Sequence, residues 1–299
     1  MARKTKNIST FQYYVSYPLQ GFVTNLFYWL FAMMPIDTAS AFGGWIGRKI
    51  GKKIKVTRRA RRNMERAFPE KSPGEIETML GDMWENLGRS VAEVPHIHKI
   101  QPGSDRLEVV GLENGLALKN DDKAGQFFTA HAGNWEVAML LARAMDMEMM
   151  CVYRAPDNPW VDSVFTKARR GFKGEMVRKG PEGARKLTAF LRKGGHIAML
   201  VDQKMNDGIA VPFFGRDAMT APSLAQFALK YDAPIVPLRL ERLQGAHFRM
   251  TFYPQLDIVQ TNDRRADMLK IMTEVNAIIE SWIRERPAQW LWVHRRWPD

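Results

Sequence analysis

A histidine and a glutamate stand five positions apart in TAHAGNWEVA, residues 129–138. The preceding residues, QFFTA, favour a β-strand, and the following EVAMLLARAM favours a helix. We therefore expect His131 at the end of a strand, and Glu136 in the first turn of a helix capped by Asn134. A carboxylate that holds one imidazole nitrogen fixes the tautomer and leaves the other nitrogen free to accept a proton. Such a pair can deprotonate a hydroxyl as it attacks an ester or thioester carbonyl.

The spacing by itself leaves a second interpretation open. His131 can simply close a strand, with Glu136 placed where a helix dipole favours a negative charge. No GxSxG motif supplies a competing serine nucleophile. The single cysteine, Cys151, lies in the apolar run MEMMCVY, which is typical of a buried strand rather than of a reactive thiol. We therefore predict general-base catalysis without a covalent enzyme intermediate.

The elements that position this pair alternate between strands and helices from residue 107 onward. Strand candidates are LEVV, QFFTA, MEMMCVY, IAMLVD and PIVPLRL, and helix candidates lie near 134–146, 158–171, 182–193, 222–231 and 263–286. This order predicts an α/β fold with a mostly parallel central sheet flanked by helices, and HFRMTFYP adds an antiparallel edge pair. In such sheets ligands bind beyond the carboxyl ends of the strands, where His131 is expected.

The motifs of nucleotide and metal sites are missing from the chain. No GxGxxG or GxxxxGK[ST] follows a strand candidate, and neither HExxH nor CxxC occurs. We expect no cofactor and no metal.

The N-terminal end differs from the rest in charge. The chain carries a net charge of +12, and almost all of it lies in residues 1–66, where Asp37 and Glu65 are the only acidic residues. Residues 7–36 have no formal charge, whereas ten of residues 48–66 are Lys or Arg. We predict an N-terminal membrane-anchoring helix over 19–36, which either spans the bilayer or lies at its surface, followed by a segment that binds anionic lipids. The chain would divide into a membrane-associating part, residues 1–66, and an α/β domain, residues 67–299.

Because the basic excess follows the apolar run, the body of the protein is expected on the cytoplasmic side. Two rival interpretations exist. Ala39, Ser40 and Ala41 resemble a signal-peptidase site, but the uncharged run is long for a cleavable signal and dense positive charge follows it. The basic segment would also suit nucleic acid, but no zinc-ligand cysteines or helix-turn-helix signature accompany it. We favour membrane attachment and expect no nucleic-acid partner.

Five ordered blocks resemble the late acyltransferases of lipid A biosynthesis, within the wider lysophospholipid acyltransferase group. HAGNWE is similar to the H-x4-[DE] block of that family. The other blocks follow in order: VYRAPDNPWVDSVFTKARRG, VDQKMNDGIAVPFFGRDAMTAPS, PIVPLRL and QWLWVHRRW. The resemblance covers nearly the whole chain.

The resemblance implies transfer of an acyl chain from acyl carrier protein to a hydroxyl of a lipid A precursor. The reaction would run at the cytoplasmic face of the inner membrane without metal or nucleotide. His131 would be the general base and Glu136 its orienting partner. Arg169 matches an active-site arginine, which would suit a phosphate or an oxyanion, and Asp202 matches the acid that opens the third block.

Other residues have open roles. Arg169, Asp202, Arg170 and Arg154 are the substrate-binding candidates. The alternatives are a solvated helix face for Arg169 and Arg170, local capping or pairing for Asp202, and a structural strand end for Arg154. Phe213 and Phe214 suggest an apolar wall for the acyl chain, and a packed loop is the alternative. His294 lies among the tryptophans of the C-terminal block, which suits the membrane interface or a docked tail. Two alternative functions remain: acylation of another membrane lipid (a glycolipid, aminolipid or lysophospholipid), and lipid binding without catalysis.

Overall fold

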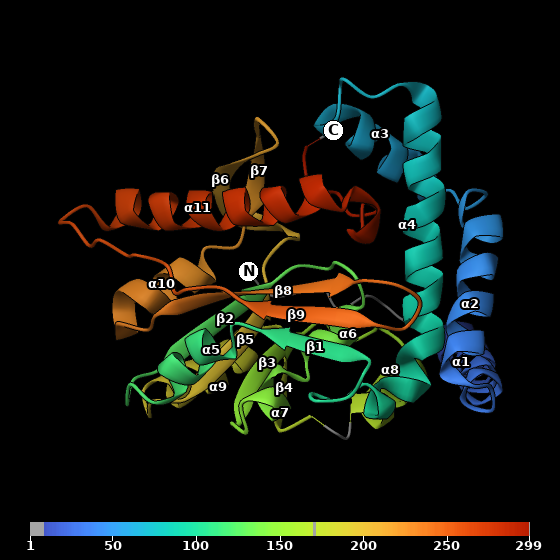
Figure 1. Cartoon of the computed structure of the whole chain (residues 1–299), viewed down its shortest axis with the longest axis horizontal. Coiled ribbons are helices and arrows are strands. Elements are labelled where there is room, and N and C mark those ends of the chain that lie inside the picture. Colours follow the sequence, from blue (N-terminus) through green and yellow to red (C-terminus); the bar gives the residue numbers. More distant parts are fainter. Residues whose placement is uncertain (1–8, 170–171, 299) are drawn as a thin grey trace.

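The computed structural model describes residues 9–169 and 172–298. Its centre is a seven-stranded sheet with the order β1-β9-β8-β2-β5-β3-β4 (Figure 1). Strands β8, β2, β5, β3 and β4 are mutually parallel, whereas β9 is antiparallel to β8 and β1 runs with β9. The prediction of an α/β fold with a mostly parallel sheet is confirmed.

The strands of the sheet are short and mostly apolar. Their bounds are β1 Leu107–Val110, β2 Gly125–Thr129, β3 Met149–Tyr153, β4 Gly174–Arg178, β5 His196–Leu200, β8 Ile235–Arg242 and β9 Phe248–Phe252. The predicted pairing of PIVPLRL with HFRMTFYP is confirmed, but β9 is not an edge strand because β1 pairs with its other side. A separate antiparallel hairpin, β6 Lys204–Phe213 with β7 Arg216–Thr220, was not predicted.

Two hydrophobic cores cover the two faces of the sheet. Successive residues of a strand point to opposite faces, so Phe127 lies in one core and Phe128 in the other. Ile235 and Val236 divide in the same way. The core around Phe128 also takes side chains of α3, α4, α9, α10 and α11, and the core around Phe127 takes those of α5, α6 and α7. Both faces of β2 are therefore buried, and only its carboxyl end leads out of the core.

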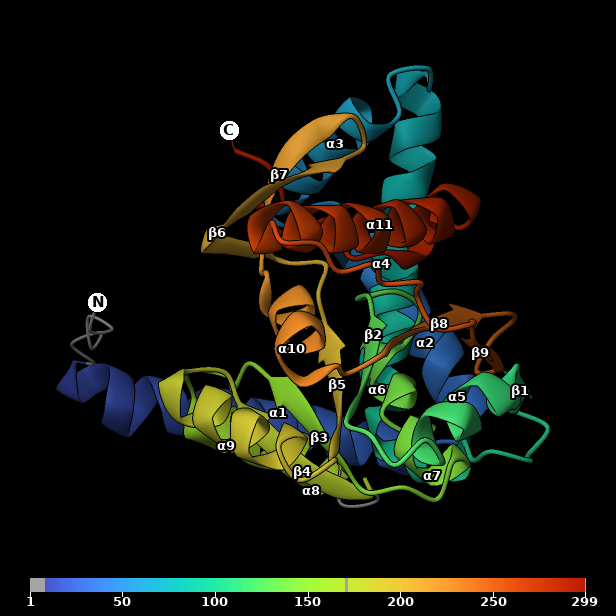
Figure 2. The same ribbon diagram turned by 90° about the vertical axis from the view of Figure 1, so that its left-hand side faces the viewer.

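The helices are α1 Tyr17–Ala32, α2 Ile36–Gly51, α3 Thr57–Ala67, α4 Pro73–Glu93, α5 Leu112–Lys119, α6 Trp135–Ala138, α7 Leu141–Ala144, α8 Pro159–Ala168, α9 Pro181–Leu191, α10 Ser223–Tyr231 and α11 Arg264–Glu285. Short turns of π- or 3-10 helix cover Gln12–Ser16, Val94–Lys99 and Pro287–Gln289. The long helix α4 begins with a capping box formed by Ser72 and Glu75. It runs along one side of the sheet, between the body and α2 (Figures 1 and 2).

The expected anchoring helix over 19–36 is interrupted. Helix α1 ends at Ala32 and α2 begins at Ile36, because Pro35 has no N–H to donate and disfavours helical backbone in the residue before it. Within the part of the chain that the structure describes, no helix has the length and apolar character needed to cross a membrane. The prediction of one continuous helix over 19–36 is therefore wrong, since α1 and α2 are separate helices.

Helices α1 and α2 nevertheless expose many apolar side chains. Both lie on the same side of the molecule (Figure 1), which faces away from the viewer in Figure 2. The exposed residues are Leu19, Phe22, Val23, Leu26, Phe27, Trp29 and Leu30 on α1, and Phe42, Trp45 and Ile50 on α2. We call this set the apolar face of α1 and α2.

Helix α2 packs on α4 through glycines. A Cβ added at Gly88 would lie 2.2 Å from the carbonyl oxygen of Gly43, and one added at Gly47 would lie 2.2 Å from the carbonyl oxygen of Trp84. The two backbones therefore approach more closely than any larger residue at these positions permits. Through this contact α2 is held against the helix that carries much of the site described next.

Candidate active site

The loop after β2 is held by backbone contacts with the C-terminal segment. Ala132 forms a β-bridge with Trp290. The carbonyl of His131 accepts a hydrogen bond from the N–H of Leu291 at 3.0 Å, and the N–H of Gly133 donates to the carbonyl of Gln289 at 3.0 Å. Gly133 has a φ of +58°, a conformation that glycine adopts without strain. The loop is thus a fixed platform at the carboxyl end of β2.

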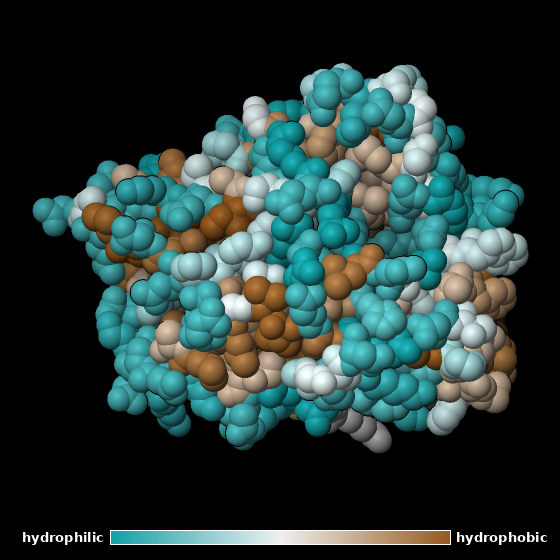
Figure 3. Space-filling view, viewed as in Figure 1, coloured by the Kyte–Doolittle hydropathy of each residue, from teal (hydrophilic) through white to brown (hydrophobic). Residues whose placement is uncertain are grey.

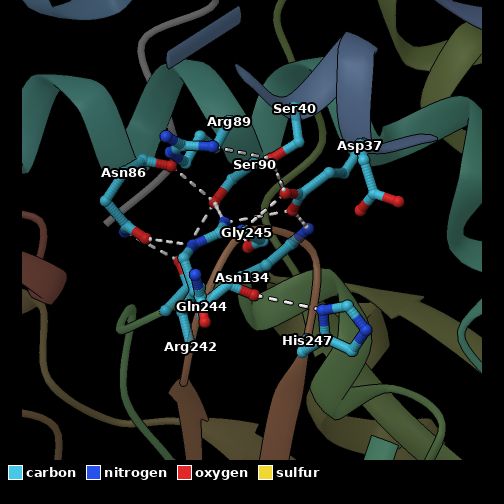
Figure 4. A network of polar contacts seen from close by, with 12 residues as sticks. Asp37, Ser40, Asn86, Arg89, Ser90, Asn134, Arg242, Gln244, Gly245 and His247 are labelled. Carbon is cyan, nitrogen blue, oxygen red and sulfur yellow. Dashed lines mark hydrogen bonds and ion pairs between the residues drawn. The ribbon is translucent and has the colours of Figure 1, made fainter. Parts of the chain in front are cut away.

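A buried polar network supports this loop from α4 and β8 (Figure 4). The carbonyl of Gly133 accepts from Nδ2 of Asn86 at 2.9 Å and from Oγ of Ser90 at 3.0 Å. The guanidinium of Arg242, on β8, donates to Oδ1 of Asn86 at 2.8 Å and forms an ion pair with Glu93. Glu93 is fully buried. A cation and several hydrogen-bond donors surround it, as a buried carboxylate requires.

Glu93 also connects the loop with α2. One carboxylate oxygen accepts from Oγ of Ser40 at 2.6 Å, and the other accepts from Nδ2 of Asn134 at 2.8 Å. Arg242 donates to both of these oxygens as well, and Figure 4 shows Ser40, Asn134 and Arg242 in this network. A single buried carboxylate therefore links the α2 helix, the α4 helix and the HAGN turn.

Asn134 caps α6, as predicted. Its Oδ1 accepts from the N–H of Glu136 at 3.2 Å, which places Glu136 in the first turn. The carboxylate of Glu136, however, does not hold His131. Both of its oxygens bind Arg169, which donates from Nε at 2.7 Å and from Nη2 at 2.6 Å. The prediction that Glu136 orients the imidazole is wrong for this structure.

The partner of His131 is Asp202. Nδ1 of His131 lies 2.7 Å from Oδ1 of Asp202, and the backbone N–H of His131 donates to Oδ2 at 2.9 Å. The indole N–H of Trp290 donates to the same Oδ2 at 2.7 Å. Asp202 is only 1% exposed, so it cannot bind substrate as the sequence suggested. Instead it accepts a hydrogen bond from Nδ1 of His131, and in the neutral form of the imidazole this bond leaves Nε2 unprotonated.

The surroundings of Asp202 keep it ionised. Burial alone would raise its pKa, but the charge and hydrogen bonds of His131, together with the bond from Trp290, lower the pKa well below its usual value. The arrangement is a buried carboxylate, an oriented imidazole and a ring nitrogen that remains available. It can accept a proton from a hydroxyl.

Two further side chains contact this pair. Nε2 of Gln203 lies 3.0 Å from Nε2 of His131 and 2.8 Å from Nε2 of His294. Burial, together with electrostatic interactions with His131, Arg154 and Arg59, lowers the pKa of His294 to about 4 against the opposing effect of Asp202. His294 is therefore neutral at pH 7.

The other predicted site residues do not form one cluster with His131. The charge of Arg154 lowers the pKa of His294, so Arg154, an exposed residue, acts electrostatically on the site. Arg169 joins Glu136; burial alone would lower its pKa, but the bonds and charge of Glu136 raise it. Arg170 lies outside the described residues.

Phe213 and Phe214 do not form an open wall. Both are buried in the core, where Phe213 packs against Trp290 and Trp297, and Phe214 against Phe68. This is the packed-loop alternative. An apolar cavity of about 20 Å³, with room for about one water molecule, lies instead beneath Trp135 and Met139 among residues of β2, β3 and β5.

The sequence did not mark Gln203, Glu93 or Arg242 as functional. Asp202 and Gln203 follow β5, the sheet neighbour of β2, and this adjacency of parallel strands is the signal that brings them to His131. Glu93 and Arg242 are 149 residues apart, and no local sequence motif marks either of them as part of a site.

The amino-acid sequence is similar to a known family and to its characterised members. Residues 8–299 match the family model described as bacterial lipid A biosynthesis acyltransferase. The chain is 26% identical over 285 residues to the lipid A biosynthesis lauroyltransferase of Escherichia coli K12, covering 90% of this chain and 88% of that protein. It is 24% identical over 259 residues to the myristoyltransferase of the same organism, covering 83% of this chain and 77% of that protein. A lipid A biosynthesis acyltransferase of Haemophilus influenzae is 24% identical over 276 residues, covering 88% of this chain and 83% of that protein. The chain belongs to the bacterial lipid A biosynthesis acyltransferase family.

Proposed function

We propose that this acyltransferase moves a fatty acyl chain from acyl carrier protein to a hydroxyl of a lipid A precursor, with His131 as the general base. The observation that carries the proposal is the contact between His131 and the buried Asp202 at the carboxyl end of β2. A histidine held in one tautomer by a buried acid is the arrangement that general-base attack of a hydroxyl requires.

The steps follow from this geometry. Nε2 of His131 takes the proton of the acceptor hydroxyl while the hydroxyl oxygen attacks the thioester carbonyl carbon. A tetrahedral oxyanion forms and collapses, the C–S bond breaks, and the thiol of the carrier leaves with the proton returned by His131. The products are an ester and a free thiol, and the net proton count of the enzyme is unchanged. Asp202 stabilises the imidazolium between the two proton transfers.

The Glu136–Arg169 pair has a separate role in this proposal. The carboxylate of Glu136 occupies Nε and Nη2 of Arg169, and the ring of Tyr153 lies 5.4 Å from the guanidinium carbon. No side chain among the described residues bonds Nη1, which could therefore take an anionic group. We assign it to a phosphate of either substrate or to the oxyanion.

The proposed location is the cytoplasmic face of the inner membrane. The apolar face of α1 and α2 would lie in the headgroup region, since these helices expose aromatic and aliphatic side chains beside lysines. A membrane-bound acceptor and a soluble carrier protein then meet at one site.

The direct test is a transfer assay with acyl carrier proteins loaded with chains of several lengths and a tetra-acylated lipid A precursor. Wild type should transfer, and His131→Ala should abolish transfer. Asp202→Asn should lower the rate by on the order of 10³–10⁴-fold, because an amide no longer fixes the tautomer. Circular dichroism controls for folding.

Transfer by His131→Ala would refute the general-base role. Transfer to a glycolipid, aminolipid or lysophospholipid but not to the lipid A precursor would reassign the acceptor and retain the mechanism. Wild-type protein that is folded and acylates no lipid hydroxyl would support lipid binding without catalysis and overturn the proposal.

A further inference from the structure

The position of Gln203 against His131 is unusual for a hydrogen bond to a ring nitrogen. Its amide nitrogen lies 3.0 Å from Nε2 and 3.4 Å from Nδ1 of the same imidazole. An atom on the in-plane lone-pair axis of Nε2 would lie much farther from Nδ1 than from Nε2. The near-equal distances therefore place the amide against the ring, and the lone pair of Nε2 stays open to a hydroxyl.

The chemistry of the neighbours fixes which end of the amide faces the histidines. Asp202 holds the proton of His131 on Nδ1. Nε2 of His131 is therefore electron-rich and would repel the carbonyl oxygen of Gln203. The amide N–H of Gln203 faces the ring instead, and a second N–H of the same group donates to Nε2 of His294 at 2.8 Å. That bond requires His294 to be neutral.

His294 itself is anchored by its backbone. Its carbonyl accepts from Nδ2 of Asn63, on α3, at 2.8 Å, and the same Nδ2 donates to the carbonyl of Trp292 at 2.9 Å. The carbonyl of Val293 accepts from Arg59 at 3.1 Å. Helix α3 thus holds the segment that carries His294, so the acceptor for Gln203 has a fixed place.

We propose that His294 is a positioning residue that acts on the general base His131 through the amide of Gln203. His294 holds Gln203, and Gln203 limits rotation of the imidazole ring, which Trp135 also contacts with ring centroids 5.4 Å apart. Asp202 sets the tautomer of His131, and the Gln203–His294 pair sets the direction of its lone pair. The inference rests on the general-base role of His131 in the proposed function.

A pair of substitutions separates this role from proton transfer by His294 and from mere packing. In His294→Gln, the side-chain oxygen takes the approximate place of Nε2 and still accepts from Gln203, but it cannot carry a proton. In His294→Leu, the acceptor is lost. We expect His294→Leu to lower kcat by roughly 10- to 100-fold with unchanged KM, since a misdirected reacting group costs about this much. His294→Gln should keep kcat within about twofold.

The exposed His98 provides the matched control, and His98→Leu should behave as wild type. Thermal unfolding of all variants excludes a folding defect as the cause of lost activity. Wild-type kcat in His294→Leu would overturn the proposal, and so would a His294→Gln variant as inactive as His294→Leu. A raised KM with unchanged kcat would show a substrate-binding role and would also overturn it.

A second measurement does not depend on the acceptor. ¹⁵N NMR of the histidine side chains, with His131 assigned by its loss in His131→Gln, should give one sharp tautomer with Nδ1 protonated in wild type and in His294→Gln. In His294→Leu the tautomer should stay the same, because Asp202 is unchanged, but the signal should broaden or split as the ring exchanges between orientations. A sharp signal in all three proteins would refute the positioning role. If the signal broadens in His294→Leu but wild type transfers no acyl chain, the proposed function fails while the positioning role stands.

Discussion

Burial decides the charge of His294 and makes folding sensitive to acid. Its pKa falls to about 4 in the folded protein, from 6.5 for the unperturbed side chain. Between these two values the unfolded chain binds the proton and the folded chain does not. The free energy of unfolding therefore decreases as the pH falls from about 6.5 to about 4, and His294 contributes no further pH dependence below that range.

The first prediction concerns this window. The lowered pKa corresponds to about 3 kcal/mol of stability that is present at neutral pH and lost at pH 4. His294→Gln has no titrating group and should lose less stability over this interval than wild type. Urea unfolding at pH 7, 5.5 and 4.5 measures the difference. Parallel pH curves for the two proteins would contradict the assignment.

The places of the HAGNWE residues in the fold could be predicted from the sequence, but the side chains that bind His131 and Glu136 could not. Spacing placed His131 at a strand end and Glu136 in a helix turn, and both placements are confirmed. The partner of His131 lies 71 residues along the chain and that of Glu136 lies 33 residues along it. A carboxylate five positions away is the nearest acid in sequence, but the parallel pairing of β2 with β5 makes Asp202 the nearest in space.

At the scale of elements, the contact between α2 and α4 depends on the absence of side chains. Gly43 of α2 and Gly88 of α4 face each other across this contact. Ser40, which is also on α2, donates a hydrogen bond to Glu93 of α4. The close approach brings the hydroxyl of Ser40 within 2.6 Å of a buried carboxylate that also holds Asn134. A displacement of α2 would therefore also shift the loop that carries His131, through Glu93 and Asn134.

The second prediction tests this contact. Gly88→Ala should lower the free energy of unfolding by about 1–3 kcal/mol, because the new Cβ would overlap the carbonyl oxygen of Gly43. Gly74→Ala, in the same helix, is the control, since a Cβ there meets no atom within 4 Å. It should be neutral or stabilising by about 0.5–1 kcal/mol. Equal destabilisation of both variants in urea unfolding would contradict close helix packing at Gly88.

Most elements could be predicted from apolar periodicity, but α5 and β4 were missed, and two further differences have identifiable causes. The hairpin of β6 and β7 turns through Phe214 and Gly215, both with positive φ. A two-residue turn of this kind is normally signalled by Asn-Gly or Asp-Gly, so a phenylalanine at the first position concealed it. The helix expected near 134–146 is two short helices, α6 and α7, and no Gly or Pro marks the break.

At the scale of the molecule, apolar and basic residues share one side. Tan and brown atoms gather at the edge over α1 and α2 in Figure 3, and Lys49, Lys53 and Lys55 are exposed beside the apolar face of these helices. Two arginines of α3, Arg59 and Arg61, are less available, since they already bond within the protein. The three lysines are therefore the better residues with which to test the proposed attraction to anionic lipid.

The third prediction follows from this distribution. Replacing Lys49, Lys53 and Lys55 with glutamine should weaken binding to vesicles with anionic lipid roughly 100-fold at low salt, because each exposed basic residue contributes about 1 kcal/mol. Sedimentation with vesicles measures the partition. The control replaces Lys179, Arg185 and Lys193, exposed in and around α9 and away from α2 in Figures 1 and 2. Equal weakening by both triple substitutions would show a non-specific charge effect.

The contacts between the two ends of the described chain have a consequence for the order in which the protein folds. Asn63 binds the carbonyl of Trp292, 229 residues away, and Trp290 completes the surroundings of Asp202. Contacts of such long sequence separation form late, after the sheet has closed the intervening loops. A chain with all its strands in place but residues 287–297 undocked would have a native-like spectrum and no catalytic site. During refolding, the secondary-structure signal in circular dichroism should therefore recover before enzymatic activity does.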